Sequence, residues 1–133
     1  MKTSSASIAG GDIHESASID PTAAIGKNVK IGANCVIGPE VTIGEGTTID
    51  SGVVISKWTN IGKDCRISNG VTIATPPQDL KYKGEKSFVV IGDRCVIREF
   101  ATIHLPTGEG KKTSIGNDCM IMTNVHIPHN ATI

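Results

Sequence analysis

The chain has 133 residues, a length that fits one domain, and its 13 basic residues balance 13 acidic ones. This neutral balance argues against nucleic-acid binding, and no apolar run approaches the ~18 residues of a membrane-spanning helix. The first dozen residues are polar and lack the apolar core of a signal peptide, so we expect a cytoplasmic protein.

An isoleucine recurs every sixth residue, starting at Ile13 and continuing without a break to Ile73. Neither the helical period of 3.6 nor strict alternation produces this series. Glycine often follows the isoleucine directly, and a small side chain usually stands two residues before it. The pattern resembles the hexapeptide repeat of left-handed parallel β-helices, in which each hexad forms a short strand and a corner and three hexads form a triangular coil.

The repeat has a simple physical interpretation. Each isoleucine points into a narrow prism and stacks on the isoleucine one coil away, while parallel strands pair about 4.8 Å apart. The small residue two positions earlier also points inward, near a corner. We expect the glycines after the isoleucines to supply tight turn conformations that other residues adopt only with strain. The left-handed sense comes from the resemblance alone.

All four cysteines, Cys35, Cys65, Cys95 and Cys119, fall at the small inward position. The last three are expected to stack on successive coils. We interpret them as core residues, because no CxxC spacing supports a thiol metal site.

The repeat is interrupted twice. Residues 75–88 contain no isoleucine where two are due, and residues 105–112 miss one. Their glycine, proline and lysine content is typical of exposed loops. Between and after the loops the phase returns and continues to Ile133. The chain is therefore predicted to be an all-β domain over residues 1–133, with about six triangular coils and two loop insertions.

The coil count places both loops at one edge. Because three hexads make one coil, Ile73, Ile103 and Ile127 are expected to stack on one face. The two loops follow Ile73 and Ile103. Three of the four histidines lie beside Ile103 or Ile127. They are His104, His126 and His129, and Trp58 is expected one coil earlier on the same edge. A rigid coil that carries loops is a common way to build a functional site.

Three segments resemble one known family. IATPPQDLKYKGEK (73–86), IGDRCVIREFATIH (91–104) and MTNVHIPHN (122–130) are similar, in that order and spacing, to the acyl-carrier-protein-dependent UDP-N-acetylglucosamine O-acyltransferases of lipid A synthesis. The resemblance implies a homotrimer with sites between subunits and an acyl transfer from acyl carrier protein to the sugar 3-position, without a cofactor or metal. It covers essentially the whole chain.

The matching positions imply roles for six side chains. His129 corresponds to the general base that takes the proton from the sugar 3-hydroxyl, and His126 to a residue that binds the donor or the sugar nucleotide. The remaining substrate-contacting positions correspond to Gln78, Asp79, Lys81 and His104. Asp79 is expected to hold sugar hydroxyls or the amide, and Lys81 to meet phosphate.

Two features depart from the family. Asn130 stands where the family commonly has aspartate; it can orient the His129 imidazole but cannot stabilise imidazolium by charge. The repeat also stops at Ile133, whereas the family continues through further coils and a C-terminal helical domain. We therefore expect the chain to correspond to the family's N-terminal portion.

Other functions fit parts of the pattern. A sugar acyltransferase using an acyl-CoA donor fits the fold but leaves the QDLKY segment unexplained. A trimeric γ-class carbonic anhydrase is a second alternative, with zinc held by His104, His126 and His129 across subunits. A truncated or non-catalytic UDP-sugar-binding β-helix is the third.

Overall fold

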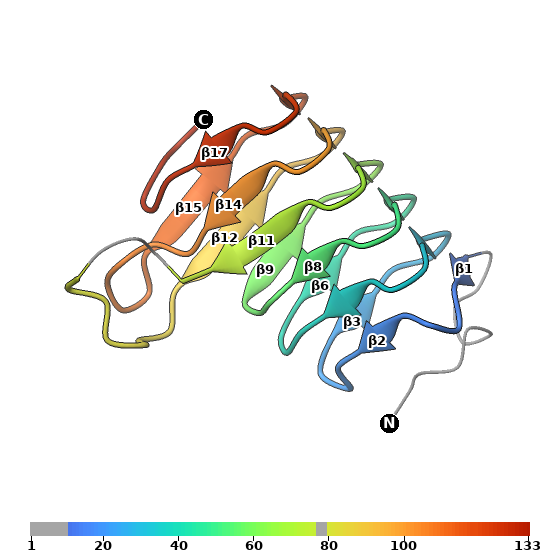
Figure 1. The fold of residues 1–133 in the computed structure, drawn as a ribbon, viewed down its shortest axis with the longest axis horizontal. Coiled ribbons are helices and arrows are strands. Elements are labelled where there is room, and N and C mark those ends of the chain that lie inside the picture. Colours follow the sequence, from blue (N-terminus) through green and yellow to red (C-terminus); the bar gives the residue numbers. More distant parts are fainter. Residues whose placement is uncertain (1–10, 77–79) are drawn as a thin grey trace.

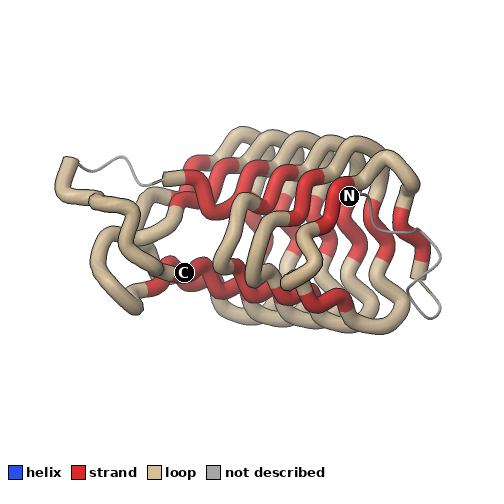
Figure 2. Tube along the Cα trace, turned by 90° about the horizontal axis from the view of Figure 1, so that it is seen from below, coloured by secondary structure: helices blue, strands red, loops and turns tan. Residues whose placement is uncertain are grey.

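The computed structural model describes residues 11–76 and 80–133, and every element in these ranges is a β-strand. The strands form three parallel sheets that wrap one coil after another into a left-handed parallel β-helix of triangular section (Figure 1). Figure 2, seen from below, shows the successive coils and the loops that extend beyond one end.

The chain visits the three sheets in turn. The first sheet contains β1 (Asp12–Ile13), β4 (Lys30–Ile31), β7 (Thr48–Ile49), β10 (Arg66–Ile67), β13 (Val96–Ile97) and β16 (Met120–Ile121). The second contains β2 (Ser18–Ile19), β5 (Val36–Ile37), β8 (Val54–Ile55), β11 (Thr72–Thr75), β14 (Thr102–His104) and β17 (His126–Ile127). The third contains β3 (Ala24–Ile25), β6 (Thr42–Ile43), β9 (Thr59–Ile61), β12 (Phe88–Ile91) and β15 (Lys112–Ile115).

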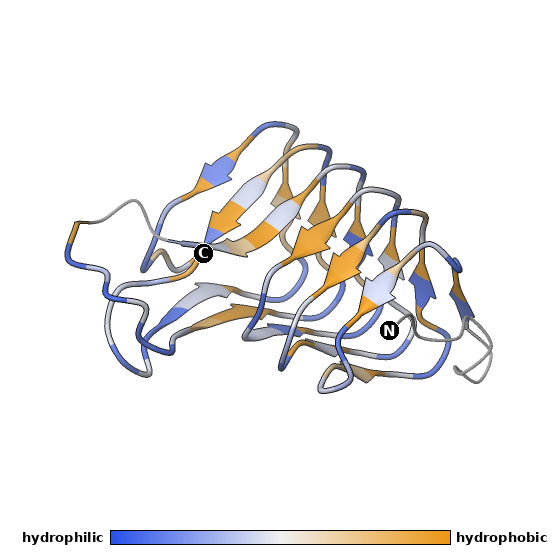
Figure 3. Ribbon diagram, turned by 60° about the horizontal axis from the view of Figure 1, so that its bottom comes forward, coloured by the Kyte–Doolittle hydropathy of each residue, from blue (hydrophilic) through white to orange (hydrophobic). Residues whose placement is uncertain are grey.

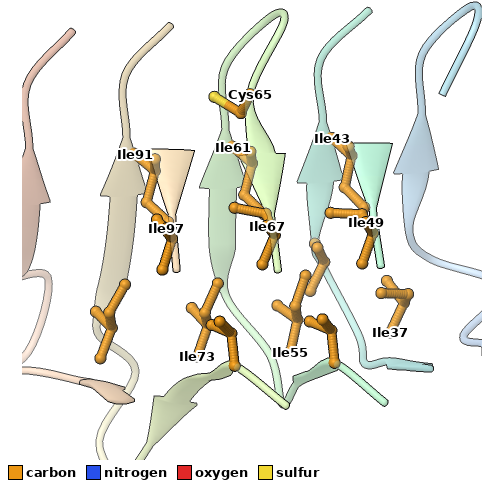
Figure 4. Close-up of a cluster of buried hydrophobic side chains, with 14 of the residues drawn as sticks. Ile37, Ile43, Ile49, Ile55, Ile61, Cys65, Ile67, Ile73, Ile91 and Ile97 are labelled. Carbon is orange, nitrogen blue, oxygen red and sulfur yellow. The ribbon is translucent and has the colours of Figure 1, made fainter. Parts of the chain in front are cut away.

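The isoleucines form the core, as the repeat predicts. Ile37 pairs with Ile55, and Ile55 with Ile73, so that each isoleucine lies over the one from the previous coil. These three side chains are at most 1% exposed, and Figure 4 shows them in one of the three internal columns. Hydrophilic residues concentrate at the corners and loops (Figure 3). The small residues two positions before the isoleucines, such as Val29, Cys35 and Val41, are buried with them, so two positions of each hexad build the core.

The glycines after the isoleucines have a different role from the predicted one. The left-handed backbone conformation falls three residues after the isoleucine, at positions such as Asn34 (φ 60°) and Gly52 (φ 73°). Gly38, directly after Ile37, has no positive φ; a Cβ there would overlap the backbone carbonyl oxygen of Ser56 on the next coil. The expectation of turn flexibility was wrong for this position: glycine is needed because neighbouring coils approach too closely for a side chain.

This distinction gives a stability prediction. We expect Gly38→Ala to lower the free energy of unfolding by about 3 kcal/mol, because its methyl group displaces a backbone carbonyl. Gly52→Ala, where the nearest atom to a Cβ is the Gly70 nitrogen at 4.0 Å and φ is positive, is expected to cost about 1 kcal/mol. Urea unfolding of both variants measures the difference. A larger loss of stability for Gly52→Ala than for Gly38→Ala would show that backbone conformation, and not the close approach of neighbouring coils, is the main reason for these glycines.

Candidate functional site

Both predicted loops leave the coil at the edge between the second and third sheets. One joins β11 to β12 and the other joins β14 to β15, and they project on the same side (Figure 1). The corner after β17 lies on this edge as well, so the predicted gathering of three histidines and two loops is confirmed. A continuous stack of strands places side chains that are more than 20 residues apart on adjacent coils.

The two loops are bound to each other. Glu85 of the first loop accepts hydrogen bonds from the backbone N–H groups of Lys83 (2.8 Å) and Gly108 (2.8 Å), and the second of these spans the loops. Backbone donors, led by Lys83, lower the pKa of the Glu85 carboxyl. Ser87 Oγ adds a second cross-link by donating to the Pro106 carbonyl at 2.9 Å. The loops therefore form one unit above the coil edge.

His104 is the most enclosed of the histidines. It ends β14 with only 6% of its surface exposed, beneath the start of the first loop. Its Nδ1 lies 2.9 Å from Thr75 Oγ1 and 2.9 Å from the Pro76 carbonyl oxygen. The side chain is thus held by the loop's first residues.

His126 lies against His104. Their ring centroids are 4.5 Å apart and the planes meet at 65°, an edge-to-face arrangement. His126 comes from β17, one coil beyond β14, and its other side is exposed. The Nε2 atom of His104 is buried and has no hydrogen-bond partner among the described residues.

His129 occupies the corner after β17 and is half-buried. The next residue, Asn130, has a left-handed backbone (φ 61°), which asparagine tolerates better than most residues. Its side-chain Oδ1 accepts from the Thr107 N–H (3.0 Å), and its Nδ2 donates to the Thr107 carbonyl (3.3 Å). Asn130 thereby attaches the His129 corner to the second loop, and its predicted role in orienting the imidazole stays a prediction.

The remaining predicted residues lie on or below the first loop. Lys81 is exposed on that loop, whereas Gln78 and Asp79 lie outside the described residues. Trp58 is half-buried one coil below, where its carbonyl accepts a hydrogen bond from Val89 N–H at the end of the loop (3.1 Å). The Lys57 ammonium lies 4.3 Å from the centre of the Trp58 ring, a cation–π contact.

Thr75 and Glu85 are the residues that the sequence pattern missed. Both lie in a non-periodic segment, and their partners, His104 and Gly108, are 29 and 23 residues away. The hexad phase carries no signal for such contacts. The only sequence sign is that each polar residue stands inside an insertion beside the histidine-bearing coils.

The cysteines behave as core residues. All four are free thiols, and burial raises the pKa of Cys35, Cys65 and Cys95. Thiols with raised pKa values are poor nucleophiles and poor ligands. Over residues 11–76 and 80–133, no cluster of three or more histidine, cysteine or acidic side chains is arranged to hold a metal ion.

The edge is suited to proton transfer. Imidazole is the side chain that most readily exchanges a proton near neutral pH. Two imidazoles, His104 and His126, are in contact here, His129 stands at the corner that follows on the same edge, and Lys81 lies on the adjoining loop. No helix in the described parts of the chain is long and apolar enough to cross a membrane.

Sequence comparison identifies related proteins. The family model described as bacterial transferase hexapeptide (six repeats) matches residues 12–45 and 40–75. The acyl-[acyl-carrier-protein]–UDP-N-acetylglucosamine O-acyltransferase of Chlamydia pneumoniae is 53% identical over 74 residues, which are 56% of this chain and 26% of that protein. The enzyme of the same name from Chlamydia muridarum is 52% identical over 75 residues.

Solved structures of similarly named proteins share the fold. UDP-N-acetylglucosamine acyltransferase from Francisella novicida superposes with a TM-score of 0.88 at 46% identity, covering 91% of this chain and 45% of that one. LpxA from Acinetobacter baumannii gives 0.86 at 43% identity, covering 88% and 46%. The chain therefore spans about a quarter of the curated relative's length in the matched region and less than half of each solved structure.

Proposed function

We propose that this chain carries the proton-transfer edge of an acyltransferase. The premise is that it is a hexapeptide-repeat protein similar to the N-terminal part of the acyl-carrier-protein-dependent UDP-N-acetylglucosamine O-acyltransferases. The reaction moves an acyl group, with a hydroxyacyl group as the expected donor, from acyl carrier protein to the 3-position of UDP-N-acetylglucosamine. This is the first step of lipid A synthesis.

The observation that supports this proposal most strongly is that His104 and His126 are in contact and that His129 shares their edge, beside the two joined loops. In the proposed reaction His129 accepts the proton of the sugar 3-hydroxyl as that oxygen attacks the thioester carbonyl. The thiolate of the carrier leaves, and the proton passes from the imidazole to it. One imidazole is therefore sufficient: it accepts the proton during the attack and returns it to the leaving thiolate.

The other residues would bind rather than react. His126 is exposed beside His104 and is proposed to hold the donor or the sugar nucleotide. Lys81, exposed on the first loop, is proposed to meet a phosphate of the nucleotide, for which an ammonium supplies a point charge. Gln78 and Asp79 are proposed to contact the sugar.

We also propose that the functional unit is a homotrimer in the cytoplasm. The outward residues of the second sheet are small and uncharged until His126, as in the register Val36, Val54 and Thr72, a composition that suits burial against a second copy. Four free cysteines fit a reducing compartment. Light scattering at micromolar concentration tests the assembly, and a monomer there counts against a site between subunits.

A transfer assay tests the activity. The chain is incubated with UDP-N-acetylglucosamine and a panel of acyl-carrier-protein thioesters of different acyl lengths, with acyl-CoA thioesters as the comparison. We expect acylated sugar nucleotide from carrier-protein donors. Transfer from acyl-CoA alone would favour the acyl-CoA alternative, and binding of the sugar nucleotide without any transfer would favour the binding-protein alternative.

A further inference from the structure

The ladder between β11 and β14 contains an extra residue beside the site. Thr72 pairs with Thr102 and Ile73 with Ile103, but the next pair is Thr75 with His104, because Ala74 bulges out of register. Ala74 is buried and adopts a left-handed backbone (φ 67°), a conformation that alanine rarely takes. The bulge turns the Thr75 side chain toward the His104 ring instead of leaving it in the regular alternation.

Two oxygens meet one nitrogen at this point. The Pro76 carbonyl can only accept a hydrogen bond, and it lies 2.9 Å from His104 Nδ1. An unprotonated nitrogen at that distance would set two acceptors against each other, so Nδ1 must carry the proton. Thr75 Oγ1, also 2.9 Å away, shares the same N–H. A neutral His104 then has its lone pair on Nε2.

We propose that the Pro76 carbonyl holds His104 in the Nδ1–H tautomer, that Thr75 is a positioning residue whose hydroxyl keeps the ring against this carbonyl, and that Nε2 is thereby reserved as a hydrogen-bond acceptor for the ligand. The inference rests on the proposed function only for the ligand's identity, a sugar nucleotide that offers hydroxyl and amide donors. The lock itself is a property of the free protein.

The burial of Nε2 supports a reserved acceptor. This atom has no partner among the described residues although it lies in the interior, where an unsatisfied polar atom is costly. The His126 ring packs edge-to-face against His104, while its outer side faces solvent. In the proposed complex the ligand donates a hydrogen bond to Nε2, which requires no change in the coil.

Nitrogen NMR of the histidine side chains tests the lock directly. Protonated and unprotonated imidazole nitrogens have separate ¹⁵N shifts, so the spectrum identifies the tautomer. We expect His104 in the wild-type chain to be protonated at Nδ1, Thr75→Val to give a mixture of tautomers, and Thr75→Ser to restore the wild-type pattern. An unprotonated Nδ1 in the wild type, or a Thr75→Val spectrum identical to it, overturns the proposal.

Titration with UDP-N-acetylglucosamine tests the reserved acceptor. In the wild type we expect the sugar nucleotide to shift the His104 Nε2 signal and leave Nδ1 nearly unchanged. Thr75→Val should raise the dissociation constant of the sugar nucleotide by about threefold to tenfold, because the lost hydrogen bond no longer holds the His104 ring in place before binding. Thr75→Ser should leave this constant unchanged. Binding that leaves Nε2 unshifted overturns the acceptor role. Absence of binding in every variant, with the tautomer pattern intact, counts instead against the proposed function.

The variants are compared only when folded. Circular dichroism and the urea midpoint establish this for Thr75→Val, which keeps the shape of threonine and loses only the hydroxyl. If Thr75→Val does not fold, Thr75→Ala and Thr75→Ser provide the same pair of hydroxyl-free and hydroxyl-bearing side chains. Loss of the Nδ1–H tautomer in both serine and alanine variants would show that the hydroxyl is not the locking group.

Discussion

Replacement of His129 by alanine is expected to lower the turnover of acyl transfer by at least about 100-fold, the low end of the effect of removing a general base. The residue occupies a half-buried corner that Asn130 attaches to the second loop through the Thr107 backbone. The corner that bears the imidazole is therefore attached to the second loop, which favours a fixed position for the proposed base. Initial rates over a range of sugar-nucleotide concentrations measure the loss.

Two other histidines provide matched controls. His126→Ala is expected to raise the KM for the sugar nucleotide more than it lowers turnover, because it removes a binding group. His14→Ala should leave both unchanged, since His14 is exposed at a different edge, where it interacts with Ser16 at 2.8 Å. Because the chain covers 45% of the Francisella novicida structure, the same variants are best repeated in a chimera that adds the rest of that relative. Unchanged turnover for His129→Ala in an active chimera would exclude His129 as the base.

Ile55→Ala is expected to lower the free energy of unfolding by about 2–5 kcal/mol, the range for large-to-small substitutions in a packed core. Ile55 is 0% exposed and lies between Ile37 and Ile73 in one internal column. A cavity there interrupts the stacking between three coils, and a narrow prism of paired strands cannot collapse to fill it. Urea or thermal unfolding followed by circular dichroism measures the change.

Thr42 supplies the comparison for this experiment. It precedes Ile43 on its strand but points outward and is exposed, and it lies on the third sheet, away from the face proposed for the trimer contact. Thr42→Ala should therefore change stability by less than about 0.5 kcal/mol. Repeat proteins can unfold in stages, and the two variants are therefore compared by whole unfolding curves as well as midpoints. Equal effects of the two substitutions would contradict the assignment of the isoleucines to the core.

The sequence alone determined the coil. An isoleucine at every sixth residue can be buried only if each hexad repeats the same local geometry, so the pattern predicts the strands, the corners and the stacking of Ile37, Ile55 and Ile73. The same count predicted that both insertions and three histidines share one edge. These are nearest-neighbour properties of a repeat, in which position in the phase determines position in space.

The tertiary structure decided the contacts that the phase does not encode. The close approach of Ser56 explains Gly38, the bulge at Ala74 turns Thr75 toward His104, and Glu85 joins the two loops. Each depends on how two non-identical segments meet across coils, with a particular carbonyl or hydroxyl at hydrogen-bond distance. A periodic pattern specifies which side chains point inward, but the proton position on His104 follows from a single carbonyl, that of Pro76, which only the folded chain brings to its Nδ1.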